Sequence, residues 1–330
     1  MSTVRPMTPL AIKSACAGLL FAASTFACAF DLQGHRGARG LAPENTLPAF
    51  AAALTLGVDT LELDTGVTRD GVVVITHDPR LNQDITRGPD GQWLKEPGPV
   101  INATTFAELQ RFDVGRLNAG SNYAKRYPEQ KSFDGTRVPR LSDLFALVRK
   151  SGNGTVRFNV ETKIDPRKPA DTLPPENFAR ALIREIRAAG MAGRTSIQSF
   201  DWRTLKVVQA EAPEIQTVYL SAQQKWLDNI ADGQWTAGLR PDSQGSVPKM
   251  VHAAGGRIWS PYFGDIDASR LTEARALGLK VVVWTVNSPA DISKMLDLVV
   301  DGIISDRPDL VRAEMQRRGM PLPAATPVSH

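Results

Sequence analysis

Imidazole, carboxylate and basic side chains stand at or just after the ends of extended runs in this sequence. In two places the members are two residues apart, so both face the same side of a strand. If the runs lie side by side in one parallel sheet, their carboxyl ends meet and these side chains converge. The set is His35, Arg36, Glu62, Asp64, His77, Glu161 and Lys163.

These residue types point to a metal site, a proton-transfer pair and an anion site. Three carboxylates without a cysteine ligand suit a hard ion, Ca²⁺ or Mg²⁺. Two histidines suit general acid and general base catalysis near neutral pH. Arg36 and Lys163 could bind an anion, for which phosphate is the first candidate.

Each of these residues also has a structural interpretation. A single histidine at a strand end is more often structural than catalytic, and paired carboxylates can be salt-bridged or solvated. Glu161 and Lys163 could form a simple ion pair. The convergence of the whole set favours function, because independent structural residues have no reason to gather at one place. His252, on an expected helix, and His330, the last residue, are expected to be non-catalytic.

Nine extended runs alternate with helical patterns along a chain of globular composition, 42% hydrophobic and 22% charged. Several runs are continuous in Val, Ile and Leu, as strands buried on both faces are. Helices that begin at a cap or Pro and stop at Gly are expected over about Pro48–Leu56 and Pro175–Ala189, after Asp267 and from Ser288. This alternation predicts a mostly parallel sheet. The runs are Phe30–Gly34, Thr60–Asp64, Val72–Thr76, Thr155–Glu161, Thr195–Ser199, Thr217–Ser221, Arg257–Ser260, Lys280–Val286 and Gly302–Ser305.

One of the nine runs is too close to its neighbour for a parallel crossover. Residues 65–71 alone separate two of the runs, whereas a crossover needs about a dozen residues. Asp70-Gly71 within them is a hairpin-turn signal. Val72–Thr76 should therefore pair antiparallel with the run before it. The other eight runs predict an α/β fold, a TIM (β/α)₈ barrel, whose β-hairpin extension brings His77 to the mouth where barrel active sites are built.

Two stretches fall outside the barrel pattern. Residues 79–140 hold little strand or helix pattern apart from Thr104–Arg111. A connection this long is usually functional, so we expect an insertion at the carboxyl-terminal mouth of the barrel. Residues 316–330 end in a Pro-rich segment and are expected to form a disordered tail. The predicted barrel domain therefore covers residues 30–315.

Residues 1–29 have the features of a signal peptide. Arg5 and Lys13 precede an apolar run of about 15 residues, shorter than the roughly 20 that span a bilayer, and residues 27–29 form an A-x-A cleavage pattern. Cleavage before Phe30 removes both cysteines and leaves 37 Lys and Arg against 35 acids, a charge of +2 that argues against a nucleic-acid protein. We expect a periplasmic or secreted protein; a buried helix or a lipid-anchored cysteine is the alternative.

Short motifs occur in a fixed order along the predicted barrel. From about residue 32 to 312 the chain resembles the glycerophosphodiester phosphodiesterase family, and in particular its periplasmic members. The resemblance is carried by Gly34-His35-Arg36-Gly37, Pro43-Glu44-Asn45-Thr46, Glu62-Leu63-Asp64, Asp70-Gly71, His77-Asp78, Glu161-Thr162-Lys163, Gln198-Ser199-Phe200, Val283-Trp284-Thr285-Val286-Asn287 and Asp301-Gly302-Ile303-Ile304-Ser305-Asp306.

The resemblance implies a TIM barrel that uses a divalent ion to hydrolyse glycerophosphodiesters to sn-glycerol 3-phosphate and an alcohol. It implies that His35 and His77 are the acid and base, and that Arg36 and Lys163 contact the phosphate. The implied metal ligands are Glu62, Asp64 and Glu161, with Ca²⁺ as the first candidate ion and Mg²⁺ as the second. The further candidates for substrate binding are Glu44, Asn45, Gln198 and Trp284. Asn45 could instead belong to a helix start, and Trp284 could simply pack.

Two other functions stay open on the sequence alone. A related barrel phosphodiesterase of phospholipase D type could act on lysophospholipid or sphingomyelin, but it would need an apolar groove, and the 79–140 insertion is polar. A non-catalytic periplasmic binding module would be favoured by loss of a histidine or carboxylate, and all five are present. The expected partners are small glycerophosphodiesters, with no nucleic acid and no stable membrane insertion. The sequence indicates neither the head group nor the oligomeric state.

Overall fold

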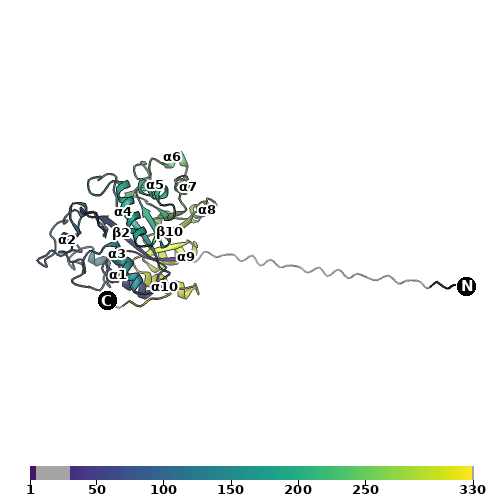
Figure 1. Ribbon diagram of the computed structural model, residues 1–330, viewed down its shortest axis with the longest axis horizontal. Helices are drawn as coiled ribbons and strands as arrows, with labels where there is room; N and C mark the ends of the chain where they lie inside the picture. The colour runs from purple at the N-terminus through teal and green to yellow at the C-terminus, as the bar shows by residue number, and fades with distance from the viewer. Residues whose placement is uncertain (5–29, 329–330) are drawn as a thin grey trace.

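The protein is a closed parallel β-barrel surrounded by helices (Figure 1). The computed structural model describes residues 1–4 and 30–328, so the predicted signal peptide lies almost wholly outside the described residues. Eight strands close the barrel, and the first pairs with both the second and the last, which confirms the predicted TIM (β/α)₈ fold. In barrel order they are β1 (Asp31–Gly34), β2 (Thr60–Val67), β4 (Arg157–Thr162), β5 (Thr195–Ser199), β6 (Gln216–Ser221), β9 (Ile258–Pro261), β10 (Lys280–Val283) and β11 (Gly302–Ser305).

A helix follows each barrel strand before the next strand begins, or closes the chain after the last one. The eight are α1 (Leu47–Leu56), α3 (Leu141–Lys150), α4 (Pro175–Ala188), α5 (Trp202–Glu211), α7 (Val247–Ala253), α8 (Ala268–Ala276), α9 (Pro289–Asp297) and α10 (Pro308–Arg317). Local signals set their ends. In α1 the Thr46 hydroxyl accepts from the Ala49 N–H (3.4 Å), and the helix stops at Gly57, whose φ of 90° favours glycine.

The predicted hairpin is present at the mouth of the barrel. Strand β3 (Val73–Ile75) pairs antiparallel with the end of β2, with Thr65 opposite Ile75 and Val67 opposite Val73. The turn between them contains Gly71 at a φ of 82°, as the Asp-Gly signal indicated. Because β2 runs beyond the barrel and β3 returns, His77 is brought back to the mouth.

The 79–140 insertion is a packed lobe with its own small core. It lies beside the barrel, around the α2 label in Figure 1, and contains α2 (Phe106–Leu109). Its buried side chains pack with Val74 of the hairpin rather than with the main core, so the lobe is anchored on β3. The cluster consists of Val74, Leu81, Ile101, Leu109, Val114 and Val138.

The last described residues fold back against the barrel helices, near the C mark in Figure 1. The Thr326 N–H donates to the Leu54 carbonyl (2.8 Å), and Arg312 Nη1 donates to the Pro323 carbonyl (2.7 Å). These two hydrogen bonds join residues of the segment expected to form a disordered tail, 316–330, to helices α1 and α10. Residues 329–330 lie outside the described part of the chain.

Side chains alternate along each strand between the helices and the barrel interior. Leu61, Leu63 and Phe158 belong to the main hydrophobic core, which lies between barrel and helices. Their neighbours Glu62 and Asn159 therefore face the barrel axis, opposite one another in the β2–β4 register. Polar and charged groups line the axis on this side of the barrel. The candidate site therefore lies at the carboxyl ends of these strands.

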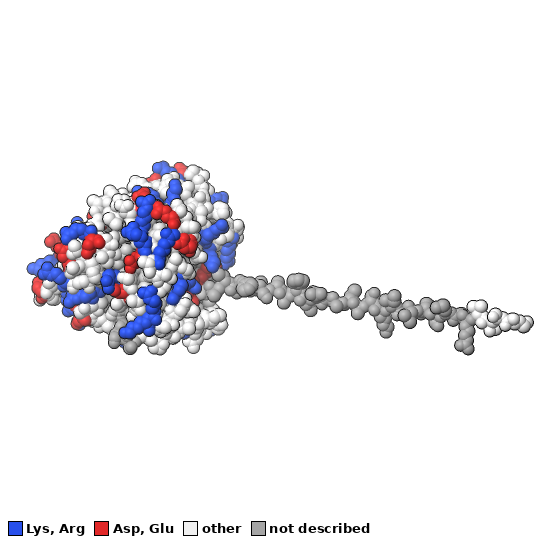
Figure 2. Space-filling view, in the orientation of Figure 1, with Lys and Arg blue, Asp and Glu red and all other residues white. Residues whose placement is uncertain are grey.

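The molecular surface carries charges of both signs. On the face in Figure 2, Lys and Arg side chains are interspersed with Asp and Glu. Among the described residues, no helix is both long and apolar enough to cross a bilayer.

Candidate active site

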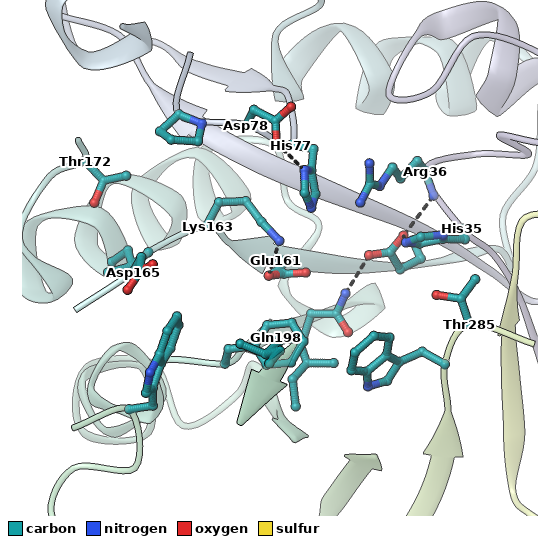
Figure 3. A pocket seen from close by; sticks show the side chains of 18 of the residues that line it. His35, Arg36, His77, Asp78, Glu161, Lys163, Asp165, Thr172, Gln198 and Thr285 are labelled. Atoms are coloured by element: carbon teal, nitrogen blue, oxygen red, sulfur yellow. Dashed lines mark hydrogen bonds and ion pairs between the residues drawn. The ribbon is translucent and has the colours of Figure 1, made fainter. Parts of the chain in front are cut away.

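A cavity of about 580 Å³ opens at the carboxyl-terminal mouth of the barrel (Figure 3). The ends of strands β1, β2, β4 and β5 line one side of it with polar groups. Most of the residues predicted from the sequence line this cavity: His35, Arg36, Glu62, His77, Glu161, Lys163, Gln198 and Trp284. Asp64 lies buried among them, while Glu44 and Asn45 line a smaller cavity behind His77.

The three predicted metal ligands converge from two neighbouring strands. Glu62, Asp64 and Glu161 are all buried, and one carboxylate oxygen of each lies within 4.8 Å of the others. Asp64 Oδ2 lies 2.9 Å from Arg36 Nε, whereas the buried Oδ1 has no hydrogen-bond partner among the residues that the structure describes. A buried oxygen without a hydrogen-bond partner, in a set of hard carboxylate donors, fits a bound Ca²⁺ or Mg²⁺.

The charges in this cluster are unbalanced without a cation. Burial and the Asp64 carboxylate raise the pKa of Glu62 well above its ordinary value. Burial, opposed by Lys163 and supported by Asp64, raises the pKa of Glu161 to about 7. Burial also disfavours ionised Asp64, but the facing charges of Arg36, His77 and Lys163 hold its pKa well below the usual range. A divalent ion would favour the ionised form of all three carboxylates.

His35 is held by a buried carboxylate that the sequence reasoning gave no role. Its Nδ1 lies 2.6 Å from Asp306 Oδ1, and its Nε2 lies 3.8 Å from Glu62 Oε2. Asp306 accepts from Arg39 Nε (2.8 Å) and from Asn287 Nδ2 (2.7 Å). Burial and the Arg39 charge lower the pKa of His35 to about 4, so its ring is neutral at neutral pH. An Nδ1–H directed at Asp306 leaves Nε2 as the basic nitrogen.

His77 has the same arrangement on the other side of the carboxylates. Its Nδ1 lies 2.7 Å from Asp78 Oδ1, and Asn82 Nδ2 donates to Asp78 Oδ2 (2.8 Å). Burial, together with the charges of Arg36 and Lys163, lowers the pKa of His77. Two neutral imidazoles therefore lie beside the cluster, each with its Nδ1 on an aspartate. Figure 3 shows His35 and His77 on different sides of the site, with Asp78 against His77.

Arg36 is the central cation of the site. Its φ is 50°, and its backbone N–H donates to Glu62 Oε2 (2.8 Å). Its guanidinium bridges Asp64 and Glu44, with Nη1 2.7 Å from Glu44 Oε1. Lys163 Nζ lies 2.8 Å from Glu161 Oε1 and 3.7 Å from Asp64 Oδ1. Both cations face the carboxylates from the cavity, where an anion could reach them.

Glu44 and Asn45 contact the site from behind. Glu44 holds Arg36 and accepts a hydrogen bond from the Tyr123 hydroxyl of the insertion. Asn45 binds Asp64 twice, donating from Nδ2 to Oδ2 (2.9 Å) and accepting from the Asp64 N–H (3.2 Å). The capping residue of α1 is Thr46, so this motif begins the helix, while Asn45 itself contacts Asp64.

An aromatic wall faces the polar side of the cavity. The Trp284 ring meets the Phe200 ring edge-to-face, with centroids 5.3 Å apart, and its Nε1 donates to the Ser260 carbonyl (3.0 Å). Trp226 lies in the short hairpin formed by β7 (Gln223–Gln224) and β8 (Leu227–Asp228), and 60% of its surface is exposed. The centroid of its ring is 6.1 Å from that of Trp284. Trp284 therefore both packs and walls the cavity.

Sequence reasoning missed Asp306, Arg39 and Tyr123. Asp306 closes a motif that the sequence analysis quoted, and its place after the last barrel strand is the signal that could have found it. Arg39 follows His35 by four residues and binds the same aspartate. Tyr123 belongs to the insertion, where no periodic pattern indicates which side chain reaches the barrel.

Comparisons with known proteins agree with this geometry. Residues 35–310 match the model of the glycerophosphoryl diester phosphodiesterase family. A curated glycerophosphodiester phosphodiesterase from Bacillus subtilis strain 168 is 28% identical over 284 residues, which cover 84% of this chain and 83% of the relative.

Solved structures share the fold. A provisionally assigned glycerophosphoryl diester phosphodiesterase from Silicibacter pomeroyi DSS-3 superposes with a TM-score of 0.80 at 36% identity, covering 89% of this chain and 95% of that one. A phosphodiesterase from Oleispira antarctica, solved with the product sn-glycerol-3-phosphate, has a TM-score of 0.62 at 21% identity, covering 87% and 96%. The chain belongs to the glycerophosphoryl diester phosphodiesterase family, a family of phosphoric diester hydrolases.

Proposed function

We propose that this chain hydrolyses glycerophosphodiesters to sn-glycerol 3-phosphate and an alcohol, with a divalent ion held by Glu62, Asp64 and Glu161 and with His35 and His77 moving the protons. The observation that carries the proposal is the pair of aspartate-bound imidazoles on either side of a buried carboxylate cluster, in which one oxygen has no hydrogen-bond partner among the described residues. Family membership and the product held by the Oleispira antarctica structure support the reaction type.

The cations and the ion would bind the phosphate. Arg36 and Lys163 face the cavity and carry the positive charge that a phosphodiester anion needs. When bound, the ion would neutralise negative charge on the phosphate oxygens. Ca²⁺ is the first candidate and Mg²⁺ the second, because three carboxylates on strand ends leave a site that flexible calcium coordination can use.

Each histidine would transfer one proton, one as the general base and the other as the general acid. A neutral imidazole takes the proton of the attacking oxygen at Nε2, and its aspartate stabilises the imidazolium that forms. The other histidine would first take up a proton at Nε2, which the negative charge of the bound phosphodiester favours, and would then give that proton to the alcohol oxygen as the phosphorus–oxygen bond breaks. The attacking oxygen is that of water or of the substrate's own glycerol 2-hydroxyl, and a cyclic phosphate formed in the second case is opened by water.

The chain would act outside the cytoplasm, in the periplasm or as a secreted protein. The support is the signal-peptide pattern of residues 1–29. Mature protein recovered from the periplasm is expected to begin at or near Phe30, which N-terminal sequencing would show. An amino terminus at a lipid-bearing Cys28 would instead indicate a lipoprotein.

Turnover of glycerophosphocholine with and without a chelator tests the proposed function. The protein starting at Phe30 should release sn-glycerol 3-phosphate, lose the activity after EDTA and regain it with Ca²⁺ or Mg²⁺. Glu62→Gln serves as the matched control, because it keeps the shape of the side chain while weakening the ion site. Full activity after exhaustive chelation would remove the metal from the proposal.

The aromatic wall favours a second candidate, hydrolysis of a diester with a larger apolar group such as lysophospholipid or sphingomyelin. The polar insertion argued against an apolar groove, yet it supplies Pro79 and Arg126 to the cavity, while the apolar lining comes from other elements. That lining includes Phe200, Leu220, Trp226, Leu227, Trp235 and Trp284. A higher kcat/KM for lysophosphatidylcholine than for glycerophosphocholine would establish this candidate, and the reverse order would exclude it.

A further inference from the structure

A file of hydrogen-bonded carboxamides runs along the inside of the barrel, away from the carboxylate cluster. Gln198 donates its Nε2–H to Glu62 Oε1 (2.6 Å) and accepts at Oε1 from Asn159 Nδ2 (2.8 Å) (Figure 3 shows Gln198). Asn159 Nδ2 also donates to Gln33 Oε1 (3.0 Å), and Gln33 Nε2 donates to Asp31 Oδ2 (2.9 Å). Asn159 is fully buried, and Gln198 and Gln33 are nearly so.

The two ends of the file fix the direction of every bond in it. An ionised carboxylate only accepts hydrogen bonds, and the proposed ion would keep Glu62 ionised. Gln33 therefore turns its Nε2 to Asp31, and Gln198 turns its Nε2 to Glu62. Each glutamine then presents its Oε1 to Asn159. The NH₂ group of Asn159 has two N–H bonds and donates to both. Asn159 is therefore the donor at the centre, and both branches lead outward from it to a carboxylate.

The orientation of Asn159 is itself held by its neighbours. Its Oδ1 accepts from the Ser196 hydroxyl (2.9 Å), and the strand register places it between Glu62 on β2 and Ser196 on β5. A flipped carboxamide would place its oxygen against the oxygens of both glutamines, which is repulsive. The Asn159 carboxamide therefore has one defined orientation, with its NH₂ group as the donor to both glutamines.

We propose that Asn159 is a positioning residue for the metal site, because its NH₂ group holds the Gln198 carboxamide with Nε2–H toward Glu62. The inference rests on the proposed metal-dependent function. The other oxygen of Glu62 is held by the Arg36 N–H (2.8 Å), so these two bonds fix the plane of the carboxylate and the lone pairs left for an ion. Without Asn159, Gln198 is free to turn its oxygen to Glu62 and push that carboxylate out of place.

The branch that leads from Asn159 through Gln33 to Asp31 offers a matched control. Gln33 bonds the same NH₂ group but leads to Asp31, which keeps Thr60 Oγ1 and Arg157 Nη2 as donors, each at 2.8 Å. A separate cavity of about 240 Å³ at this end of the barrel is lined by Gln33 and Asp31, so water can replace a lost bond there. Gln33→Leu therefore removes one buried carboxamide and leaves the bond from Gln198 to Glu62 intact.

Calorimetric titration of the protein starting at Phe30 with Ca²⁺, and separately with Mg²⁺, tests the proposal. Asn159→Leu should weaken the Kd about 10- to 100-fold, the range typical of residues that orient metal ligands, while Gln33→Leu should change it by about twofold or less. Thermal unfolding of both variants checks that they lose comparable stability. Asn159→Asp, which keeps the volume and replaces NH₂ by oxygen, gives the same readout if Asn159→Leu does not fold.

Activity of the variants adds a second readout. A displaced ligand is compensated by mass action, so saturating ion should restore most of the kcat of Asn159→Leu. Equal Kd values for the Asn159 and Gln33 variants would overturn the positioning role and leave the proposed function intact. A wild-type protein that bound neither ion would instead refute the metal-dependent function, and this inference with it.

Discussion

The two halves of the barrel interior differ in what they hold. Strands β1, β2, β4 and β5 direct Gln33, Glu62, Asn159 and Gln198 to the axis, and the groups of the site continue at their carboxyl ends. In the strand register, Val218 of β6 lies opposite Gln198, and Ile304 of β11 lies opposite Gln33. Both side chains are apolar and buried. One half therefore carries the polar groups proposed for the chemistry, most of them held by hydrogen bonds to one another, while the other half presents apolar side chains.

Removing a metal ligand from the polar half should have the largest effect. Asp64→Ala removes the carboxylate oxygen that has no hydrogen-bond partner in the described part of the chain. A metal ion stabilises the charge of the transition state by several kcal/mol, so its loss should lower kcat/KM by about 10³-fold or more. Metal binding by calorimetry should fall with it. Asp309→Ala, a surface carboxylate paired with Arg307, is the control and should keep both properties. Retained turnover in Asp64→Ala would mean that the chemistry is not centred on these carboxylates.

Removing either histidine should come next. His35→Ala and His77→Ala should each lower kcat by about 10²–10⁴-fold, the usual contribution of a proton-transfer residue, with little change in metal affinity. Bis(p-nitrophenyl) phosphate has a leaving group that needs no proton, so the variant lacking the general acid should recover most of its rate on this substrate. The variant lacking the base should not recover, which identifies both roles. Wild-type rates for both variants on both substrates would refute the two-histidine mechanism.

Neutralising Asp306 should have a smaller effect that depends on pH. Burial opposes ionisation of Asp306, but Arg39 and His35 hold its pKa below the ordinary value of 3.8. Its ionised form therefore stabilises the fold above pH of about 4, and this stabilisation is lost as the pH falls through the lower, folded pKa. Asp306→Asn should lower the Tm at neutral pH, and the gap to wild type should close at strongly acidic pH. Because His35 loses its partner, kcat should also drop about tenfold or more; a gap that widened on acidification would contradict the assignment.

Changes in the apolar half should have the smallest effect. Trp226→Ala removes an exposed aromatic ring at the edge of the cavity. An aromatic contact contributes about 0.5–1.5 kcal/mol, so kcat/KM for glycerophosphocholine should fall about 2- to 10-fold. The loss should appear in KM, with kcat nearly unchanged, since Trp226 touches none of the proton-transfer groups. A fall in kcat comparable to that of the histidine variants would break the division between the two halves.

The barrel and the centre of the site could be predicted from the sequence because their signals are local. Buried strands are continuous apolar runs, the turn at Asp70-Gly71 has its own signature, and the spacing of Glu62 and Asp64 puts both on one face. Helices α3, α7 and α10 also end beside Gly152, Gly255 and Gly319, so the same punctuation could have delimited them.

The residues that the sequence did not reveal act through contacts between distant segments. Asp306 meets His35 across 271 positions of the chain, and Tyr123 reaches Glu44 from an insertion without periodic pattern. Asn159 had a local signal, since it precedes Glu161 by two residues and shares its face, but its role depends on the amide orientation of Gln198. The hydrogen bonds of the last described residues to Leu54 and Arg312 likewise have no signal in the local sequence pattern.

The most direct test of the division between the two halves is a crystal structure with Mn²⁺ and sn-glycerol 3-phosphate, using the anomalous signal of the ion to locate it. We expect one peak among Glu62, Asp64 and Glu161, with the phosphate between it and Arg36 and Lys163, and the rest of the ligand toward Trp284. A peak elsewhere, or a phosphate seated against the aromatic wall with the carboxylates unoccupied, would contradict it.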